Sequence, residues 1–552
     1  MKIKTFTSAI LLLVTVSLTA QIKITESSLE KSKTLPKEQV FVHYNTNFLL
    51  TGESLYFKIY NLYKKTKTLS SLSKIAYVKL LDINKKAILK RKIILKEGEG
   101  YGDIFIPSDI KSGNYKLIAY TKWMKNTNSY FEDDILIINP FEKKIIFNHE
   151  PKKSKKKVHD FTYNTRSLVT INLKDLIDTN GKYSISIRKD NEGILSKKKS
   201  NQDFYDLKEE TFLKGSLVYL PEFRGQLITG KVTPTSNDTN LKDIKVGLSV
   251  IGNDQIFKIT STNDNGDFFF NIAEPFHSEK IFCKLIDKNK STNYKISFPI
   301  QNELDFKNLK FPKTKTTQDI IKTINDRSIN IQVQNAYNET TKDSIMPFNI
   351  SNSIFEDKLI SYNLDDYKRF NTIEETFIEI IENAWIGKKN GENKVFVRNS
   401  GALTNFNLPT LIIIDGFIIT DYEEFIDINP KKVKTISLLR EKYKYNSKLY
   451  EGIIFLESKK ESYTPKDQNS LIAIPFQNIF PRKKYFHKNY YLKEKSRVPD
   501  FRSQLLWEPE INTINKKISF YTSDIKGYFT IEIQGFSKKG TPINIIKFLK
   551  VK

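Results

Sequence analysis

The stretch LPTLIIIDGFII, residues 408–419, is the strongest fold signal in this chain. It consists of two apolar runs separated by Asp415 and Gly416. Asp-Gly between two apolar runs is typical of a tight β-hairpin, because both residues tolerate the positive φ that such a turn requires. We therefore expect a hairpin here, and backbone geometry alone explains Asp415 and Gly416 without a catalytic role.

The segments on either side of this hairpin extend the pattern. Residues 372–381 carry apolar side chains at helical spacing with acids in the first turn, which predicts an amphipathic helix. Strands are expected at 394–398, 429–439 and 450–456. This order of helix, strand, Asp-Gly hairpin, Pro-led strand and Gly-Ile-Ile strand resembles the plug domain of TonB-dependent outer-membrane receptors, assigned here to residues 366–462.

The resemblance to a receptor plug has two departures. Where plugs carry Tyr-Gly and then a Gly-rich segment, this chain has Tyr443-Lys444-Tyr445-Asn446 and the single Gly452. Fewer than 100 residues follow the plug-like segment, whereas a barrel of this class needs about 200 or more at about 10 residues per strand. We therefore expect a plug-like domain without a barrel, which serves as an adapter for a partner protein.

Short runs that alternate apolar and polar residues fill the region between residues 39 and 140, as expected for half-buried strands. The expected strands are 39–44, 54–60, 76–81, 102–106 and 113–121. This region resembles the second macroglobulin domain (MG2) of the alpha-2-macroglobulin superfamily, through residues 42–44, 50–58 and 106–115. The resemblance implies a structural module. The Cys-Gly-Glu-Gln thioester run of active macroglobulins is absent from the sequence, so covalent trapping of a protease is not supported.

The remaining segments also indicate β-sandwiches. Residues 221–232, 244–250 and 261–270 resemble the carboxypeptidase regulatory-like β-sandwich that precedes some receptor plugs. The expected organisation is a signal peptide at 1–20, an MG2-like sandwich at 22–142, a basic linker at 143–160, a small sandwich at 161–222, the regulatory-like sandwich at 223–310, a connecting segment at 311–365, the plug-like domain at 366–462, and a linker with a C-terminal macroglobulin-like sandwich at 463–552.

The fold class is thus predicted as mainly β: tandem immunoglobulin-like or macroglobulin-like β-sandwiches plus a small α+β plug-like domain. The order of these segments is similar to a family of secreted Bacteroidota multidomain proteins. That resemblance covers nearly all of the mature chain, and residues 311–365 are its weakest part.

The N-terminus has the pattern of a secretory signal, with lysines, then the apolar run 9–14, then small residues before Gln21. The alternative is an anchor helix, but the apolar run is shorter than the about 20 residues that a bilayer requires. No later segment of the sequence is apolar enough for a transmembrane helix. Cys283 is the only cysteine, so no intramolecular disulfide can form. It lies in the alternating run 281–285, which predicts a buried small residue and not a reactive thiol.

The formal net charge of +26 raises the question of nucleic-acid binding. Lysine far outnumbers arginine, and lysine, asparagine and isoleucine are all abundant, which is typical of an AT-rich genome. We therefore expect no nucleic-acid partner. Attraction of the basic surface to anionic envelope glycans or lipid headgroups is a better alternative than nucleic-acid binding.

Motifs for catalysis or for cofactor binding are missing from the sequence. It contains no Gly-x-Ser-x-Gly, His-Glu-x-x-His, Gly-x-x-x-x-Gly-Lys or Gly-x-Gly-x-x-Gly run. The five histidines are scattered, and the acidic run 263–267 is interpreted as a hairpin turn and not as a calcium loop, because the distal Glu of such a loop is missing. We therefore expect no catalytic, cofactor-binding or metal site.

These observations favour a non-enzymatic cell-envelope protein, an adapter or accessory component that docks on outer-membrane proteins by strand addition or insertion. It is expected to be exported and to be periplasmic or associated with the outer membrane. An alternative is a surface module that binds glycan or peptidoglycan through exposed aromatic side chains. A third interpretation, a macroglobulin-type inhibitor, requires a bait region and a thioester that the sequence does not show.

Overall fold

The computed structural model describes residues 34–142 and most of residues 161–552. Within the second range it does not describe residues 175, 191–197, 204–210, 213–217, 236–239, 252–255, 273–279, 287–292, 299–303, 313–317, 338–341, 347–357, 402, 446–447, 461–462, 467–470, 475–476, 491–497 and 516. The expected signal peptide and the basic linker 143–160 therefore lie outside the described residues. In the part that is described, no helix is long and apolar enough to cross a membrane.

The described chain is mainly β, as the sequence predicts, and it forms two compact units. We call residues Thr34–Gln226, Asn302–Phe348 and Ile479–Lys552 the frame unit. We call residues Leu227–Gln301 and Asn349–Asn478 the inserted unit. The chain thus passes between the two units four times.

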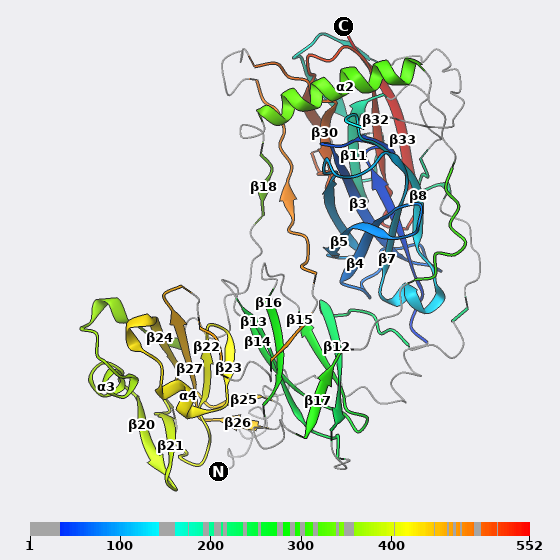
Figure 1. Ribbon diagram of the computed structural model, residues 1–552. Coiled ribbons are helices and arrows are strands. Elements are labelled where there is room, and N and C mark those ends of the chain that lie inside the picture. The colour runs from blue at the N-terminus through cyan, green and yellow to red at the C-terminus, as the bar shows by residue number, and fades with distance from the viewer. Residues whose placement is uncertain are drawn as a thin grey trace, which may run out of the picture. The chain divides into compact units, whose positions relative to one another are not determined.

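The first part of the frame unit is a β-sandwich, blue to cyan in Figure 1. One sheet contains, in order, β1 (Glu38–Tyr44), β3 (Ser54–Tyr63) and β6 (Glu99–Phe105). The other contains β2 (Phe48–Leu50), β8 (Phe131–Ile138), β7 (Gly113–Thr121), β4 (Ile75–Leu81) and β5 (Ala87–Ile94). Side chains such as Phe57, Val78 and Ile135 fill the core between the sheets. The strands expected to be half-buried are largely buried on both faces, since polar side chains such as His43 and Lys58 are also buried.

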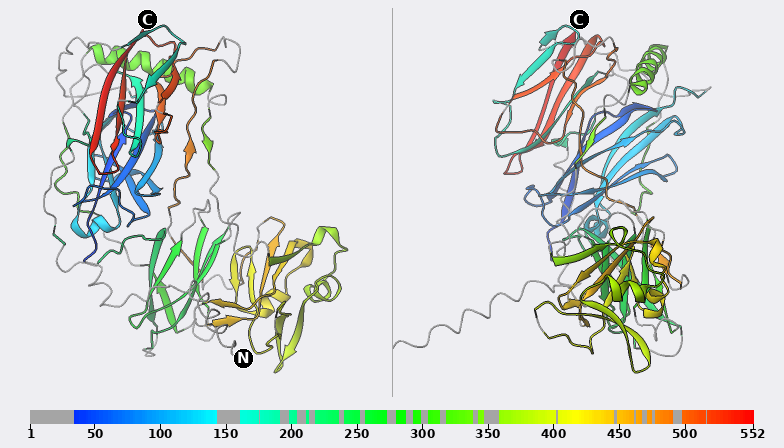
Figure 2. Two further views of the ribbon diagram at one scale, coloured as in Figure 1. Left: turned by 180° about the vertical axis from the view of Figure 1, so that it is seen from behind. Right: turned by 90° about the vertical axis from the view of Figure 1, so that its left-hand side faces the viewer.

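The second part of the frame unit is one sandwich made from two distant segments. Its five-stranded sheet has the order β30 (Gln504–Glu508), β11 (Lys182–Lys189), β32 (Gly527–Phe536), β33 (Pro542–Val551) and β9 (Phe161–Tyr163). Its two-stranded sheet pairs β10 (Leu168–Asn172) with β31 (Lys517–Tyr521). The views in Figure 2 show these strands beside the first sandwich.

This arrangement differs from the two separate sandwiches expected at 161–222 and 463–552. Strand β11 pairs on one side with β30 and on the other with β32, so segments far apart in sequence share one sheet and one apolar core. The physical reason is non-local hydrogen bonding, which the local alternation of residues does not encode.

A helix of 19 residues, α2 (Gln318–Ala336), lies within the expected connecting segment 311–365 and packs on the first sandwich. Ile324, Ser328 and Ile331 repeat at helical spacing. Ile324 is buried against Phe48 and Leu136, whereas most other described side chains of the helix are at least partly exposed. Such a narrow buried stripe explains why the apolar pattern of this helix is weak in the sequence.

The inserted unit begins with a β-sandwich in the range for which the sequence predicts a regulatory-like domain, and we call this sandwich the regulatory-like part after that prediction. One sheet has the order β15 (Asp267–Ile272), β12 (Gln226–Pro234) and β17 (Tyr294–Ser297). The other has the order β14 (Ile256–Ser261), β13 (Lys245–Ile251), β16 (Lys280–Leu285) and β28 (Ile472–Ala473). Because β14 and β15 belong to different sheets, the run 263–267 is a turn that links the sheets and not the hairpin turn expected.

The second part of the inserted unit is built on a mixed five-stranded sheet between Leu359 and Ser458, and we call it the plug-like part after the sequence prediction for this range. Its order is β19 (Leu359–Asn363), β24 (Val433–Leu439), β27 (Ile453–Ser458), β22 (Leu411–Ile414) and β23 (Phe417–Ile419). The hairpin expected at Asp415 and Gly416 is confirmed, because β22 and β23 pair antiparallel and the two residues have φ of 47° and 87°. The sheet starts at Leu359, before the boundary expected at residue 366.

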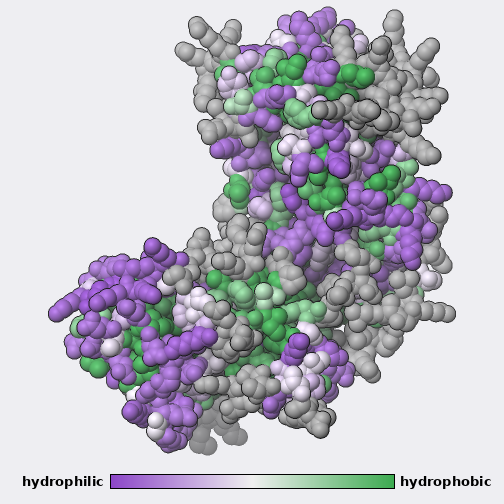
Figure 3. All heavy atoms as spheres, viewed as in Figure 1, coloured by the Kyte–Doolittle hydropathy of each residue, from purple (hydrophilic) through white to green (hydrophobic). Residues whose placement is uncertain are grey.

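Two short helices and a hairpin accompany this sheet. They are α3 (Ile373–Glu379), α4 (Tyr422–Ile426) and the pair β20 (Ala384–Lys389) and β21 (Glu392–Val397). Helix α3 begins with a capping box between Thr372 and Glu375, which agrees with the predicted helix. On the face seen in Figure 3, hydrophilic side chains predominate over the plug-like part, and hydrophobic ones show between them.

The regulatory-like and plug-like parts share an apolar core. Ile259 and Ile286 pack with Leu411, Ile413 and Ile418 of the plug-like sheet. Gly247 lies at this contact, since a Cβ there would come within 2.5 Å of Ile286 Cδ1. The two segments that the sequence presents as separate domains therefore form one unit.

Candidate functional site

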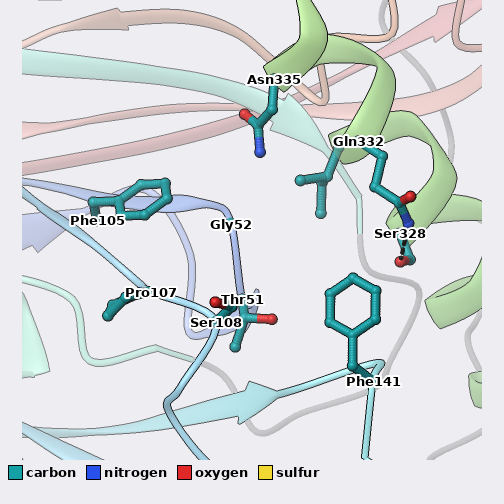
Figure 4. A pocket seen from close by; sticks show the side chains of 10 residues that line it. Thr51, Gly52, Phe105, Pro107, Ser108, Phe141, Ser328, Gln332 and Asn335 are labelled. Carbon is teal, nitrogen blue, oxygen red and sulfur yellow. Dashed lines mark hydrogen bonds between the residues drawn. The ribbon is translucent and has the colours of Figure 1, made fainter.

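A groove on the frame unit lies between helix α2 and the loops of the first sandwich (Figure 4). Its volume is about 280 Å³. The lining residues are Thr51, Gly52, Phe105, Pro107, Ser108, Phe141, Ser328, Ile331, Gln332 and Asn335. Phe141 and Phe105 are 65% and 49% exposed, which is unusual for such large apolar side chains. The groove is thus an apolar recess with a neutral polar rim.

Gly52 allows the close approach that forms the floor of the groove. It has φ of 92°, and a Cβ at this position would lie 3.0 Å from Ile331 Cγ2 and 3.3 Å from Asn335 Nδ2. A larger residue would be strained in this backbone conformation and would also push helix α2 away. The Gly52-Glu53 pair, which in the sequence signals only a turn into β3, therefore also positions the helix.

Glu53 fixes helix α2 by a buried ion pair. Its carboxylate accepts hydrogen bonds from Arg327 on α2, with Nη2 to Oε2 at 2.6 Å and Nε to Oε1 at 2.9 Å. Arg188 on β11 donates to the same carboxylate at 3.0 Å. Glu53 therefore joins the first sandwich, the second sandwich and the helix.

The electrostatic balance at Glu53 favours its charged form. Burial alone would raise its pKa, but Arg327 and Arg188 hold the pKa below its usual range. Burial also lowers the pKa of Arg188, to about 10, against the opposing attraction of Glu53. These charges hold helix α2 against the first sandwich. Because α2 lines the groove, we expect the groove to be formed before any ligand binds.

A layer of buried polar side chains lies where the two sandwiches of the frame unit meet. His43 Nδ1 is 2.7 Å from Ser184 Oγ, and the Tyr60 hydroxyl is 2.9 Å from the same oxygen. Lys198 Nζ donates to Glu532 at 2.5 Å. Ser184, His43 and Glu532 have the composition of a nucleophile, base and carboxylate set.

The geometry of these three residues favours a structural role. Ser184 and His43 are 0% and 1% exposed. The distance from His43 Nε2 to Glu532 Oε2 is 3.9 Å, too long for a hydrogen bond. Burial lowers the pKa of His43, so the ring is neutral in the folded chain at neutral pH. The sequence did not indicate this cluster, because its members lie on strands that are far apart in the chain.

The residues that the sequence analysis singled out have structural environments. Cys283 is buried on β16, and burial raises the pKa of its thiol, which agrees with the predicted inert residue. Asp415 is buried, and its carboxylate accepts hydrogen bonds from Ser458 N at 2.7 Å, Ser458 Oγ at 2.6 Å and Tyr463 N at 3.1 Å. Asp415 therefore anchors the end of β27 in addition to shaping its turn.

The other candidate ligands do not assemble. Asp133 accepts the hydroxyl of Tyr44, while the adjacent Asp134 faces Lys116, so the two carboxylates point apart as expected. Of the five histidines, His149, His159 and His277 lie outside the described residues. Within the described part of the chain, no group of three or more His, Cys, Asp or Glu side chains is placed to hold a metal ion.

Comparison with known proteins adds little beyond this geometry. No protein-family model matches the chain, and no curated sequence matches it. The solved structure of Escherichia coli alpha-2-macroglobulin activated by porcine elastase aligns over 93% of this chain and 44% of its own length, with 9% identity and a TM-score of 0.24. Salmonella alpha-2-macroglobulin reacted with methylamine aligns over 93% and 39%, with 8% identity and a TM-score of 0.23.

A third solved structure, dimeric latent PorU from Porphyromonas gingivalis, aligns over 48% of this chain and 33% of its own length, with 10% identity and a TM-score of 0.17. The chain thus spans less than half the length of each of these three proteins. Overlays at such TM-scores establish no common fold.

Proposed function

We propose that this chain is a non-enzymatic protein of the bacterial cell envelope that docks on a partner protein. The signal-like N-terminus and the resemblances to MG2, regulatory-like and plug-like segments support an exported protein, either periplasmic or associated with the outer membrane. The groove beside Gly52 is the observation that carries the proposal.

The groove suits one large apolar side chain of a partner protein. Its volume of about 280 Å³ lies below the range of about 300–1,000 Å³ that is usual for small-molecule sites. Phe105, Phe141 and Ile331 provide apolar walls, while Gln332 and Asn335 offer amide groups to a neighbouring peptide backbone. An apolar anchor in a preformed recess with a polar rim is the usual centre of a protein–protein contact.

Site-specific photo-crosslinking tests this proposal. A photoreactive amino acid at Gln332 is expected to capture one envelope protein, whereas the same group at Ile83, which is 67% exposed elsewhere on the frame unit, captures none. The captured protein is then identified, purified and titrated against the full chain. Phe141→Ala and Phe105→Ala are each expected to weaken that affinity about tenfold or more, and Ile83→Ala serves as the matched control.

Two results would overturn the proposal. Equal capture from both positions would show contact without specificity. Unchanged affinity of the Phe105 and Phe141 variants would show that the groove is not the contact. Binding of the chain to purified peptidoglycan, combined with no protein capture, would assign it to the glycan-binding class instead.

A further inference from the structure

The β20–β21 hairpin of the plug-like part presents aromatic side chains on its outer face. Ala384, Val395 and Val397 point inward, where they are buried in the plug-like core. The alternate cross-strand pair, Trp385 and Phe396, therefore points outward. Their rings stack with centroids 5.5 Å apart and an interplanar angle of 20°. Figure 1 shows that this hairpin extends beyond α3 and the five-stranded sheet.

The loop after the hairpin adds apolar side chains that remain exposed. Phe406 packs edge-on against both rings, with centroid distances of 6.0 Å, and is still 55% exposed. Leu403 is 93% exposed, the highest value among the large hydrophobic residues that the structure describes. Lys389 Nζ donates to Phe406 O at 2.8 Å and to Asn407 Oδ1 at 2.6 Å, which holds the loop on the hairpin.

The hairpin and its loop carry more basic than acidic residues, and Glu423 of α4 contacts the hairpin through Asn393. Residues 384–407 contain Lys388, Lys389, Lys394 and Arg398 against the single acid Glu392, a net charge of +3. Glu392 pairs with Lys394, with Nζ to Oε2 at 2.8 Å. Lys388 and Arg398 are exposed. Lys388 pairs with Asn393 next to the hairpin turn and alternates onto the face of Ala384. The hairpin and loop thus combine an apolar tip, a partly exposed tryptophan and excess positive charge.

We propose that this hairpin-and-loop surface, residues 384–401 and 403–407, binds a lipid bilayer that carries anionic headgroups. Leu403 and Phe406 enter the interfacial layer, Trp385 lies at headgroup depth, and the basic side chains contact lipid phosphates. Tryptophan is enriched at this depth because its ring is amphipathic. Surface binding strengthens with buried apolar area and with attraction between basic residues and anionic lipid.

A bilayer explains features that a glycan or a rigid partner protein does not. An aliphatic tip such as Leu403 gains free energy from an apolar layer without a complementary pocket. A sugar chain offers Leu403 no such layer. The bilayer contact goes beyond the proposed protein docking and does not depend on it, because the groove beside Gly52 lies on the frame unit.

Intrinsic fluorescence gives a direct test, because the chain has three tryptophans and two of them are buried. Trp123 and Trp507 are 2% and 3% exposed, so a change in emission on adding vesicles reports Trp385. Vesicles of phosphatidylcholine with about one quarter phosphatidylglycerol should shift the emission of the full chain to the blue. Pure phosphatidylcholine should shift it much less, and high salt should weaken the effect.

Variants with matched controls separate the two parts of the surface. In vesicle co-sedimentation, Leu403→Ala with Phe406→Ala is expected to weaken binding about tenfold. Ile83→Ala with Ile514→Ala, at exposed positions on the frame unit, should leave it unchanged. Lys388→Glu with Arg398→Glu should weaken binding to the anionic vesicles, whereas Lys442→Glu with Lys444→Glu, which are exposed and make the same charge change, should have little effect.

The inference would be overturned if no vesicle shifted the emission, or if the Leu403/Phe406 variant bound as tightly as the native chain. A blue shift with soluble alginate but with no vesicle would assign the surface to an anionic glycan. Thermal unfolding of each variant checks that the fold is retained.

Discussion

Two contacts inside this molecule join β-rich parts in different ways. In the frame unit, the two sandwiches meet through buried charges and hydroxyls, among them Glu53, Arg188 and Ser184. Aromatic contacts such as Phe536 against Phe41 and Tyr60 lie beside them. In the inserted unit, the regulatory-like and plug-like parts meet through aliphatic side chains such as Ile286 and Ile413. A polar contact requires one geometry, whereas an apolar contact gains stability mainly from the area that it buries. The polar contact thus fixes how the two sandwiches of the frame unit align, whereas the apolar contact mainly adds stability to the inserted unit.

Removal of the Glu53 carboxylate should cause the largest loss of unfolding free energy. Glu53→Ala leaves Arg188 and Arg327 buried without their anion, which should lower the unfolding free energy of the frame unit by about 3–5 kcal/mol. Urea unfolding in a Trp385→Phe background measures this, because Trp123 and Trp507 then report the frame unit alone. Glu510→Ala, which breaks an exposed pair with Arg482, should cost below about 1 kcal/mol. Equal losses in both variants would contradict the ion-pair explanation.

A methyl group at Gly247 tests the apolar contact. The new Cβ would approach Ile286 Cδ1 at 2.5 Å and Ile418 Cδ1 at 3.0 Å. Because both atoms are side-chain ends that can shift, Gly247→Ala should cost about 1–3 kcal/mol. Hydrogen exchange measured by mass spectrometry should become faster than in the native chain for β22 and β27, and it should change less in the frame strands. Gly401→Ala, where no atom lies within 4 Å, is the control and should change nothing measurable.

Loss of one hydroxyl tests the polar layer more gently. Ser184→Ala removes the partner of His43 Nδ1, although the Tyr60 hydroxyl still donates to Gln534 O at 3.1 Å. The expected loss is about 1–2 kcal/mol in the frame unit, measured in the same Trp385→Phe background. Ser519→Ala, whose hydroxyl contacts Thr170 at an exposed position, should stay close to the native value. A Ser184 variant as stable as the native chain would show that this layer does not hold the sandwiches.

Acidification should produce the smallest difference between the two contacts. Burial lowers the pKa of His43, and the charges of Lys198 and Lys58 lower it further, against the opposing effect of Glu532. As pH falls through the unfolded value of about 6.5, the unfolded chain binds a proton that the folded chain does not, so stability of the frame unit falls. The depressed pKa values of Glu53 and Glu532 add a further loss below about pH 4.5.

Urea midpoints at about pH 7.5 and about pH 5.5 measure the histidine part of this effect. The frame unit should lose stability over that range, and His43→Gln should flatten the dependence. The described residues that form the aliphatic contact of the inserted unit, such as Ile259 and Ile413, have no group that titrates in this range. A larger pH effect there than in the frame unit would contradict the assignment.

The sequence predicted local structure well and long-range pairing poorly. Alternation of apolar and polar residues located β1, β3, β4, β6 and β7 within a few residues. It did not show that the polar faces of β1 and β3 are buried as well. It did not show that β11 lies between β30 and β32, since hydrogen bonds between backbones carry no residue pattern. Helix α2 was missed for a related reason, because few of its side chains are buried.

The candidate sites follow the same rule. The Gly52-Glu53 pair was recognised as a turn, but its role in holding Arg327 required a helix that starts far along the chain. Aromatic residues 385, 396 and 406 were visible in the sequence, yet core and surface aromatics look alike until the inward face of β20 and β21 is known. Exposure is a property of the tertiary fold, so it had to come from the structure.

The interleaved path of the chain has a consequence for how it folds during synthesis. Strand β11 leaves the ribosome early, but its neighbour β32 follows much later, as the contact between Ser184 and Gln534 across 350 residues shows. Until β30 and β32 have been synthesised, the backbone hydrogen-bonding groups along the edges of β11 lack their partners. Such unpaired edges are prone to pair with other chains. Most strands of the inserted unit pair with strands that are nearer in sequence, so this unit is expected to fold first. During synthesis the chain is therefore prone to aggregate through β11 until its last strands have been made.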